Sequence, residues 1–278
     1  MKRNDIVLLD GAMGTKLWEK AENKVPVWRY NLEQPGIVSE VTREYVEAGA
    51  EIVQANTFGA NCYAVRRAGY AVGDVVSAGV RMAREAAGTR ARVALSVGPL
   101  PVLMEPYGDL TEEEAIAAFD EQIAPGVAEG ADLIAFETFM DADMMRVAVE
   151  AASRYSLPVF ATMTFAEMGK TIMGHSVERF VEALEGLPVT AVGLNCSLGP
   201  EKAVPVIASF EQYTDLPLIF KPNAGKPVTE NGENRVEYDI DTFVTDCMPA
   251  LEYNVKYIGG CCGSSPDYIR AMIRRIRG

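Results

Sequence analysis

Short apolar runs alternate with longer amphipathic stretches along the whole chain. The runs are rich in Val, Ile, Leu and Ala and end at turn residues, which is typical of strands buried on both faces of a parallel sheet. Eight such strands are predicted, at residues 6–10, 51–55, 93–97, 133–137, 159–164, 191–196, 218–221 and 255–259.

The stretches between these runs repeat apolar residues at helical spacing. Eight helices are predicted, at residues 38–47, 75–87, 112–129, 142–155, 177–184, 201–213, 241–253 and 266–275. Eight β/α units of roughly 35 residues each match the size of a (β/α)8 TIM barrel. We therefore expect a single-domain α/β barrel over residues 1–278. A doubly wound open sheet is the alternative, but no Gly-x-Gly-x-x-Gly follows the first strand.

Three connections, at residues 19–36, 98–110 and 225–239, are longer than the others. Each follows a predicted strand and so belongs to the carboxyl end of the barrel, where loops build binding sites. In the last of them, Asn231-Gly232 favours the turn of a small hairpin.

The chain is acidic, with a formal net charge of −13 over 278 residues. This charge argues against a nucleic acid or an anionic membrane as partner, because both are bound through clustered Lys and Arg. Asp10 interrupts the first apolar run, and every apolar run is shorter than a signal peptide core or a membrane span. We expect a cytoplasmic protein.

Three of the five cysteines stand where predicted strands end. Cys196 closes Gly-Leu-Asn-Cys after the sixth strand, and Cys261 and Cys262 lie in Gly-Gly-Cys-Cys-Gly after the eighth. The carboxyl ends of barrel strands share one face, so three thiolates are predicted to converge there. Three protein ligands with an open fourth position are typical of catalytic zinc. Cys62 and Cys247 have no comparable setting.

Three thiolates on Zn²⁺ leave one net negative charge. Such a site is a weak Lewis acid for making hydroxide, but it keeps an added sulfur ligand deprotonated and nucleophilic. The pattern therefore favours alkylation of a thiol over hydrolysis. The alternative is structural: Cys196 is a core residue, and Cys261 and Cys262 form a vicinal disulfide or a packing pair.

Two carboxylates stand at the same predicted rim. Asp10 ends the first strand before Gly11, and Glu137 ends the fourth. Together they suit the ammonium group of an amino acid, while backbone N–H groups near Gly11 suit its carboxylate. Thr57 adds a polar group after the second strand. Alternatively, Asp10 caps the next element and Glu137 is a satisfied surface charge.

Glycines after the last two strands allow a second interpretation. Loops there hold phosphate in many barrels, so Gly225 and residues 263–265 are candidates for a phosphate site. Ser264 or Ser265 before Pro266 also fits a helix N-cap followed by proline at the first helical position.

These motifs together resemble the homocysteine S-methyltransferase family over nearly the whole chain. The resemblance is carried by residues 10–15, 54–58, 136–138, 193–196 and 259–263. Within the family, residues 163–165, 197–200 and 222–227 are most similar to the homocysteine-binding barrel of cobalamin-dependent methionine synthase.

The resemblance implies a zinc ion bound by the three rim cysteines, with the homocysteine thiol as fourth ligand and methionine as product. It implies that Asn223 completes the zinc sphere when homocysteine is absent. The residues implied to contact the rest of the substrate are Asp10, Gly11, Thr57, Glu137 and Asn195.

The methyl donor is less determined. The methionine synthase branch implies methylcobalamin, and because no corrinoid module follows this barrel in the sequence, we expect a separate corrinoid protein to carry it. The alternative is a small donor, S-methylmethionine or betaine, held by an aromatic cage. Trp28 and Tyr30 are the nearest aromatics, and we expect them to pack their loop instead.

Lys221 departs from the branch, in which an acidic residue is expected before Pro-Asn-Ala-Gly. It either reshapes the mouth or contacts an acidic partner. As the only lysine at a predicted strand end, it also permits a different class of enzyme, a phosphate-binding aldolase or isomerase with a Schiff-base lysine. A non-catalytic module that binds zinc or thiols is the remaining alternative.

Overall fold

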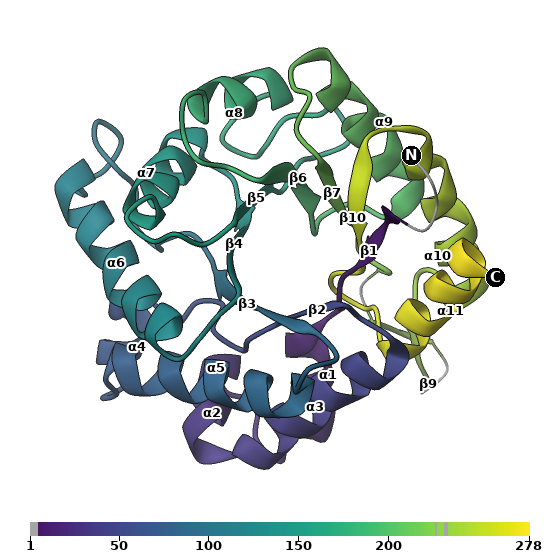
Figure 1. Cartoon of the computed structure of the whole chain (residues 1–278), viewed down its shortest axis with the longest axis horizontal. Coiled ribbons are helices and arrows are strands. Elements are labelled where there is room, and N and C mark those ends of the chain that lie inside the picture. Colours follow the sequence, from purple (N-terminus) through teal and green to yellow (C-terminus); the bar gives the residue numbers. More distant parts are fainter. Residues whose placement is uncertain (1–4, 226, 231–232) are drawn as a thin grey trace.

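The computed structural model describes residues 5–225, 227–230 and 233–278 and shows a ring of parallel strands surrounded by helices (Figure 1). The strands of the ring are β1 (Val7–Leu8), β2 (Ile52–Gln54), β3 (Arg92–Val97), β4 (Leu133–Phe139), β5 (Val159–Met163), β6 (Ala191–Asn195), β7 (Leu218–Lys221) and β10 (Val255–Ile258).

The ring closes on itself. Its strand order is β1-β10-β7-β6-β5-β4-β3-β2, with parallel pairing throughout. The two ends of this order, β1 and β2, are joined by a parallel bridge between Leu9 and Ile52 and by a hydrogen bond of 2.8 Å from Glu51 N to Leu8 O. The predicted (β/α)8 barrel is confirmed, and the open doubly wound sheet is excluded.

Each predicted helix is present, with ends that differ by a few residues. They are α3 (Pro35–Ala48), α5 (Val72–Ala87), α6 (Glu112–Ala128), α7 (Ala142–Ala152), α8 (Val177–Ala183), α9 (Pro200–Ser209), α10 (Ile240–Cys247) and α11 (Pro266–Arg277). The predicted helices at 201–213 and 241–253 end earlier as α-helices and continue as the 3₁₀ turns η3 (Phe210–Gln212) and η4 (Met248–Glu252). No helix within the described ranges is both long and apolar enough to span a membrane.

Four short helical elements were not predicted. They are α1 (Met13–Lys20), η2 (Val27–Arg29), α2 (Tyr30–Glu33) and α4 (Cys62–Arg67), all in loops at the carboxyl end of the barrel. Each is only one or two turns long, so tertiary packing stabilises it more than its own propensity does. The predicted 19–36 loop is therefore largely a helical cover beside the mouth.

The core has two layers. The barrel interior is filled by buried side chains from all eight strands, including Phe160 and Tyr257, whose ring centroids lie 4.4 Å apart. A larger apolar layer lies between the strands and the helices. Because side chains fill the barrel axis, the carboxyl-end mouth is the place left for a binding site.

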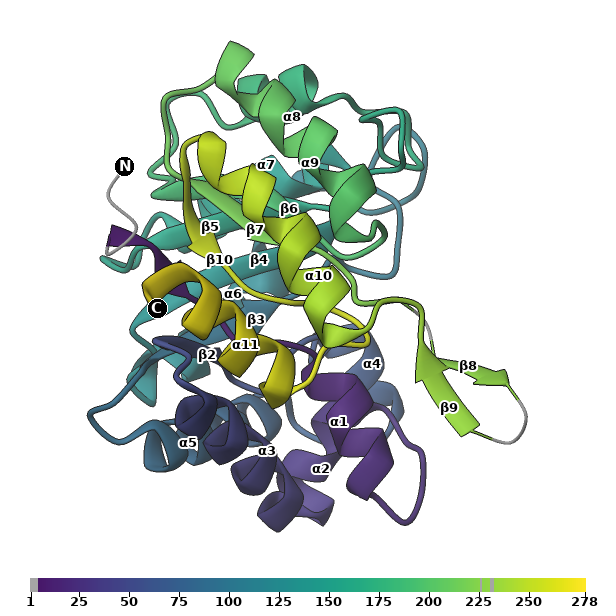
Figure 2. The ribbon, with the colours of Figure 1, turned by 90° about the vertical axis from the view of Figure 1, so that its right-hand side faces the viewer.

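A small hairpin extends from the barrel after β7 (Figure 2). Its strands β8 (Pro227–Glu230) and β9 (Glu233–Val236) pair antiparallel, as the Asn-Gly motif predicts. The predicted turn residues, 231–232, lie outside the described residues. The hairpin emerges at the carboxyl end of the barrel, the same end that carries the cysteines.

Candidate active site

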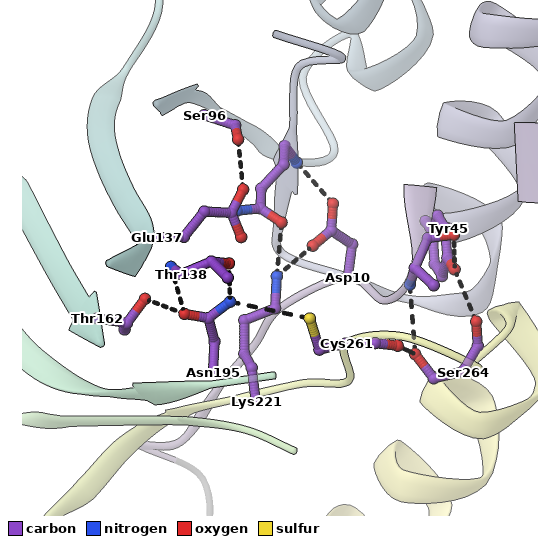
Figure 3. A network of polar contacts seen from close by, with 12 residues as sticks. Asp10, Tyr45, Ser96, Glu137, Thr138, Thr162, Asn195, Lys221, Cys261 and Ser264 are labelled. Atoms are coloured by element: carbon purple, nitrogen blue, oxygen red, sulfur yellow. Dashed lines mark hydrogen bonds and ion pairs between the residues drawn. The ribbon is translucent and has the colours of Figure 1, made fainter. Parts of the chain in front are cut away.

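Every strand of the barrel has a polar residue at or near its carboxyl end, and Figure 3 shows most of these side chains. Several of these groups hydrogen-bond across the mouth. The polar residues at the strand ends, one for each strand in sequence order, are Asp10, Gln54, Ser96, Glu137, Thr162, Asn195, Lys221 and Cys261. Gln54, Ser96 and Thr162 were not predicted as part of the site. The available signal for Ser96 and Thr162 was a single polar residue inside an otherwise apolar run.

The three rim cysteines converge as predicted from their positions. Their sulfur atoms lie within 4.8 Å of one another, and Cys196 Sγ is 3.7 Å from Cys262 Sγ. Sulfur atoms bound tetrahedrally to zinc at about 2.3 Å are separated by about 3.8 Å. All five cysteines are free thiols, so the vicinal disulfide is not formed. The sulfur arrangement fits zinc.

Local backbone strain aims Cys196 at the other two sulfurs. Cys196 and Ser197 have φ values of 63° and 59°, in the left-handed region that side chains other than glycine rarely adopt. Cys196 N donates to Lys221 O at 3.1 Å, and Leu198 N donates to Cys196 O at 2.8 Å, which holds the turn. Such strain concentrates at functional sites.

The turn that carries Cys261 is held by Ser264. Ser264 Oγ donates to Cys261 O at 2.7 Å and accepts from Ala12 N at 3.3 Å, which joins the two loops. A Cβ at Gly260 would lie 2.3 Å from this hydroxyl, and a Cβ at Gly11 would lie 2.5 Å from it. Both glycines are therefore required by close packing around Ser264.

The structure confirms the predicted helix N-cap before Pro266. Ser265 is the N-cap residue of α11 and Pro266 occupies its first turn, but the Ser265 side chain makes no capping hydrogen bond. Ser264 is 1 % exposed and engaged with Cys261 and Ala12. Its hydroxyl is thus used within the protein.

Of the three clustered thiols, Cys196 loses its proton most readily. Hydrogen bonds from Cys261 and Cys262 lower the pKa of Cys196 to about 3. The same contact raises the pKa of Cys262 to about 11 and raises that of Cys261 well above its usual range. One sulfur is therefore ready as a thiolate, and a bound metal would have to displace the remaining protons.

Asn223 lies beside the cysteines with an unused oxygen. Its side chain hydrogen-bonds to Cys196, while its buried Oδ1 has no hydrogen-bond partner among the described residues. Backbone bonds fix the loop, with Asn223 N donating to Leu198 O and Ala224 N donating to Cys262 O. A buried oxygen without a partner is costly unless a cation or water satisfies it. Three sulfurs and one such oxygen form a donor set that fits zinc.

Asn195 links the metal side of the mouth to the carboxylate side. This fully buried side chain accepts from Thr138 N at 2.7 Å and Thr162 Oγ1 at 2.8 Å. It donates to Thr138 Oγ1 at 2.8 Å and to Cys261 Sγ at 3.8 Å. Thr138 has a φ of 64°, so Asn195 also supports a strained residue next to Glu137. Direct contact of Asn195 with substrate stays a prediction.

Asp10 is engaged inside the protein. Its Oδ1 accepts from Lys221 Nζ at 2.9 Å, and its Oδ2 accepts from Gln54 N at 2.6 Å. Lys221 Nζ also donates to Gln54 Oε1 at 2.6 Å. Asp10 and Lys221 are 1 % and 4 % exposed. Burial lowers the pKa of Lys221, but Asp10, Glu137, Cys261 and the hydrogen bond to Asp10 together raise it above its usual value, so the lysine is a stable cation.

Glu137 is the less enclosed of the two rim carboxylates. It is half-buried, and its Oε1 accepts from Ser96 Oγ. Burial raises the pKa of Glu137, and the nearby charge of Lys221 partly offsets this. Below these groups the barrel leaves a cavity of about 20 Å³, room for about one water molecule.

Thr57 and the loop aromatics are packed within the protein. Thr57 is fully buried and its Oγ1 donates to Ser96 O at 2.7 Å, so its predicted substrate contact remains a prediction. Trp28 and Tyr30 are also buried, with Trp28 5.9 Å from the Tyr70 ring, which confirms that they pack their loop.

Sequence comparisons agree with this arrangement. A family profile described as homocysteine S-methyltransferase matches residues 7–276. Two curated relatives named methionine synthase, from Mycobacterium leprae and Mycobacterium tuberculosis, are 30 % and 31 % identical over 96 % of this chain. The chain spans 24 % of the length of each.

Solved structures with the same fold include a methyltransferase. The oxidized form of the homocysteine methyltransferase MmuM from Escherichia coli has a TM-score of 0.82 at 25 % identity, covering 98 % of this chain and 96 % of that one. Its metallated form, at 24 % identity and with a TM-score of 0.82, shows the likeness of fold alone.

Proposed function

Because the chain belongs to the homocysteine S-methyltransferase family, we propose that it methylates the thiol of homocysteine to form methionine, with zinc held by Cys196, Cys261 and Cys262. The observation that carries the proposal is that three free thiols converge at one point of the barrel mouth with Asn223 Oδ1, which has no partner in the described part of the chain. A structural zinc site would instead use four permanent ligands.

The chain's own residues would prepare the thiol for attack. When bound, zinc lowers the pKa of the substrate thiol and keeps its sulfur nucleophilic. Asn195 orients Cys261, and Asn223 offers an oxygen that the substrate sulfur replaces. The homocysteine proton leaves to solvent, the sulfur–carbon bond forms, and the donor keeps the electron pair of the bond that breaks. The barrel thus supplies deprotonation and alignment.

The amino-acid end of homocysteine would lie between the first and fourth strands. Glu137 is half-buried beside the mouth and can accept from the ammonium group. Gly11 lies in the loop that Ser264 ties to the cysteine turn, so its backbone is held close to the sulfur atoms. Thr57 and Asp10 would support this pocket from below, since both are almost fully buried.

For the methyl donor we favour methylcobalamin held by a corrinoid protein. Large apolar side chains are exposed on the loops that follow β2 to β5, among them Met168 at 90 % and Ile172 at 83 % exposure. Exposed apolar groups that gather at a site mark surfaces for macromolecules. We define this apolar rim as Phe58, Leu103, Tyr107, Met140, Met168, Ile172 and Met173.

The alternatives are less well supported. A cage for S-methylmethionine or betaine cannot use Trp28 and Tyr30, which are buried in their loop. A Schiff-base enzyme needs a lysine whose amine loses its proton readily, whereas the carboxylates around Lys221 raise its pKa. A zinc-binding module without activity remains the second candidate, because it would use the same thiol cluster.

Anaerobic methyl transfer to homocysteine tests the proposal directly. The zinc-loaded protein is given methylcobalamin, S-methylmethionine or betaine, and methionine is measured. We expect product from methylcobalamin, its loss in Cys262→Ala, and its retention in Cys62→Ala, which removes a thiol outside the cluster. Methionine from S-methylmethionine or betaine alone would refute the corrinoid donor, and zinc binding without product from any donor would support the inactive module.

The role of Asn223 is tested by X-ray absorption at the zinc edge. Without homocysteine, the spectrum of wild-type protein should contain a signal from the amide carbon bonded to Asn223 Oδ1. We expect Asn223→Ala to lack this signal. With homocysteine bound, the mutant and wild-type spectra should coincide, because the thiol has then replaced Asn223. Identical resting spectra would show that Asn223 is not a ligand.

A further inference from the structure

Lys221 is a buried cation in the part of the mouth where a substrate ammonium is expected. It is the last residue of β7, and its side chain crosses the barrel to β1 and β2 (Figure 3). Its Nζ lies 2.9 Å from Asp10 Oδ1 and 2.6 Å from Gln54 Oε1. Lysine has three N–H donors, so these contacts leave one.

Asp10 has little left to offer a substrate. One of its oxygens accepts from Lys221 and the other from the backbone of Gln54. The side chains of Asp10 and Lys221 are 1 % and 5 % exposed. Separating a buried pair leaves an uncompensated charge, so a substrate ammonium would not displace Lys221 without a large energetic cost.

The lysine also changes the charge that a substrate meets. With both carboxylates ionised, Asp10, Glu137 and Lys221 carry a formal net charge of −1, whereas the two carboxylates alone would carry −2. The cavity beneath them holds about one water molecule, so an ammonium cannot reach Asp10 from below. Glu137 is left as the carboxylate of this cluster that faces the substrate.

We propose that Lys221 determines substrate specificity by supplying, within the protein, the cation that Asp10 would otherwise draw from the substrate. The acceptors are then short thiol carboxylic acids, and an α-amino group adds affinity only through Glu137. This inference rests on the proposed function, since it concerns the thiol that the zinc site receives. It predicts that the site also admits a thiol acid without an amino group.

The test compares two thiols that differ only in the amino group. L-homocysteine and 4-sulfanylbutanoate are titrated by anaerobic calorimetry into the zinc-loaded full chain. Their ratio of affinities isolates the amino group, because both share the thiol and the carboxylate. One charged hydrogen bond to Glu137 gives a preference of about tenfold for homocysteine, whereas bonds to both carboxylates give about a hundredfold or more.

Two variants decide whether Lys221 sets this ratio. Lys221→Gln keeps a donor for Asp10 but removes the charge, and its preference for homocysteine should be about tenfold greater than that of the wild type. Lys20→Met removes a lysine paired with Glu40 and Glu44 on the surface, and it should leave the ratio unchanged.

Distinct outcomes would overturn the inference. A wild-type preference of about a hundredfold or more would mean that Asp10 binds the substrate ammonium directly. An unchanged ratio in folded Lys221→Gln would also refute the inference. If Lys221→Gln does not fold, the wild-type preference still decides. Failure of both thiols to bind the wild type would instead refute the proposed function.

Discussion

Single residues in the mouth hold one another in geometries that they would not adopt alone. Thr138 and Cys196 both have left-handed backbones; Thr138 lies one residue before the end of β4, and Cys196 directly follows β6. Asn195 hydrogen-bonds both to Thr138, beside Glu137, and to Cys261, in the thiol cluster. Conformations of this kind persist only where surrounding contacts compensate their cost. The site therefore depends on a residue that need not touch the zinc.

Asn195→Ala should weaken both zinc binding and the fold. Loss of an outer contact to a metal ligand lowers metal affinity by about 10- to 100-fold. The lost buried hydrogen bonds should lower the free energy of unfolding by about 2–4 kcal/mol. A chelator competition measures the first and urea denaturation the second.

Asn254→Ala is the matched control. Its side chain donates to Asp215 O and Leu216 O at 3.2 Å each, ahead of β7 at the other end of the barrel. It should alter stability alone. Unchanged zinc affinity in Asn195→Ala would show that this residue does not position Cys261.

At the scale of elements, the approach of neighbouring strands determines where the sulfur atoms lie. β6 leads directly to Cys196 and pairs with β7, which leads to Asn223. A Cβ at Gly193 would lie 2.0 Å from Ile219 O, a backbone atom of β7. Gly193 is thus required for the spacing of these two strands, and it belongs to the motif that ends at Cys196.

Gly193→Ala should destabilise the protein by about 1–3 kcal/mol or more, because the clash is with backbone that cannot turn aside. Gly36→Ala is the control, since Gly36 lies in α3 and an added Cβ there meets nothing within 4 Å. That change should raise stability by about 0.4–1 kcal/mol. Urea denaturation measures both, and equal stabilities would mean that β6 and β7 can separate freely.

All the candidate functional groups lie at one end of the barrel. Its interior is closed by packed side chains, while the carboxyl end carries the thiol cluster, the acidic groups and the apolar rim. The loops after β2 to β5 line part of the mouth with exposed apolar side chains. The corrinoid partner that we propose would dock on this face, from which its methyl group could reach the sulfur.

Met168→Glu tests docking on the apolar rim. The corrinoid module of a methionine synthase, loaded with methylcobalamin, serves as donor, and its rate of transfer should fall about tenfold because a charge then lies in the interface. Transfer from free methylcobalamin should not change. Tyr213→Glu, at an exposed position ahead of β7 on the opposite end, should affect neither rate. Equal loss with both donors would refute docking at Met168.

The amino-acid pattern alone was enough to predict the barrel and the thiol cluster. Eight apolar runs separated by amphipathic stretches favour a (β/α)8 barrel over a doubly wound sheet, and residues at the carboxyl ends of barrel strands then share a face. This is why Cys196 and Cys261, far apart in the chain, could be predicted to meet. The short helices α1, α2 and α4 were missed because their local pattern is weak and packing stabilises them.

The contacts of each rim residue could be read only from the folded barrel. The direction of the Lys221 side chain, the engagement of Asp10 and the burial of the Thr57 hydroxyl depend on distances across the barrel. Strand periodicity specifies the end at which a side chain lies, but rotamers and cross-barrel partners specify what it binds. The ionic pair between β1 and β7 therefore became visible only when the ring closed.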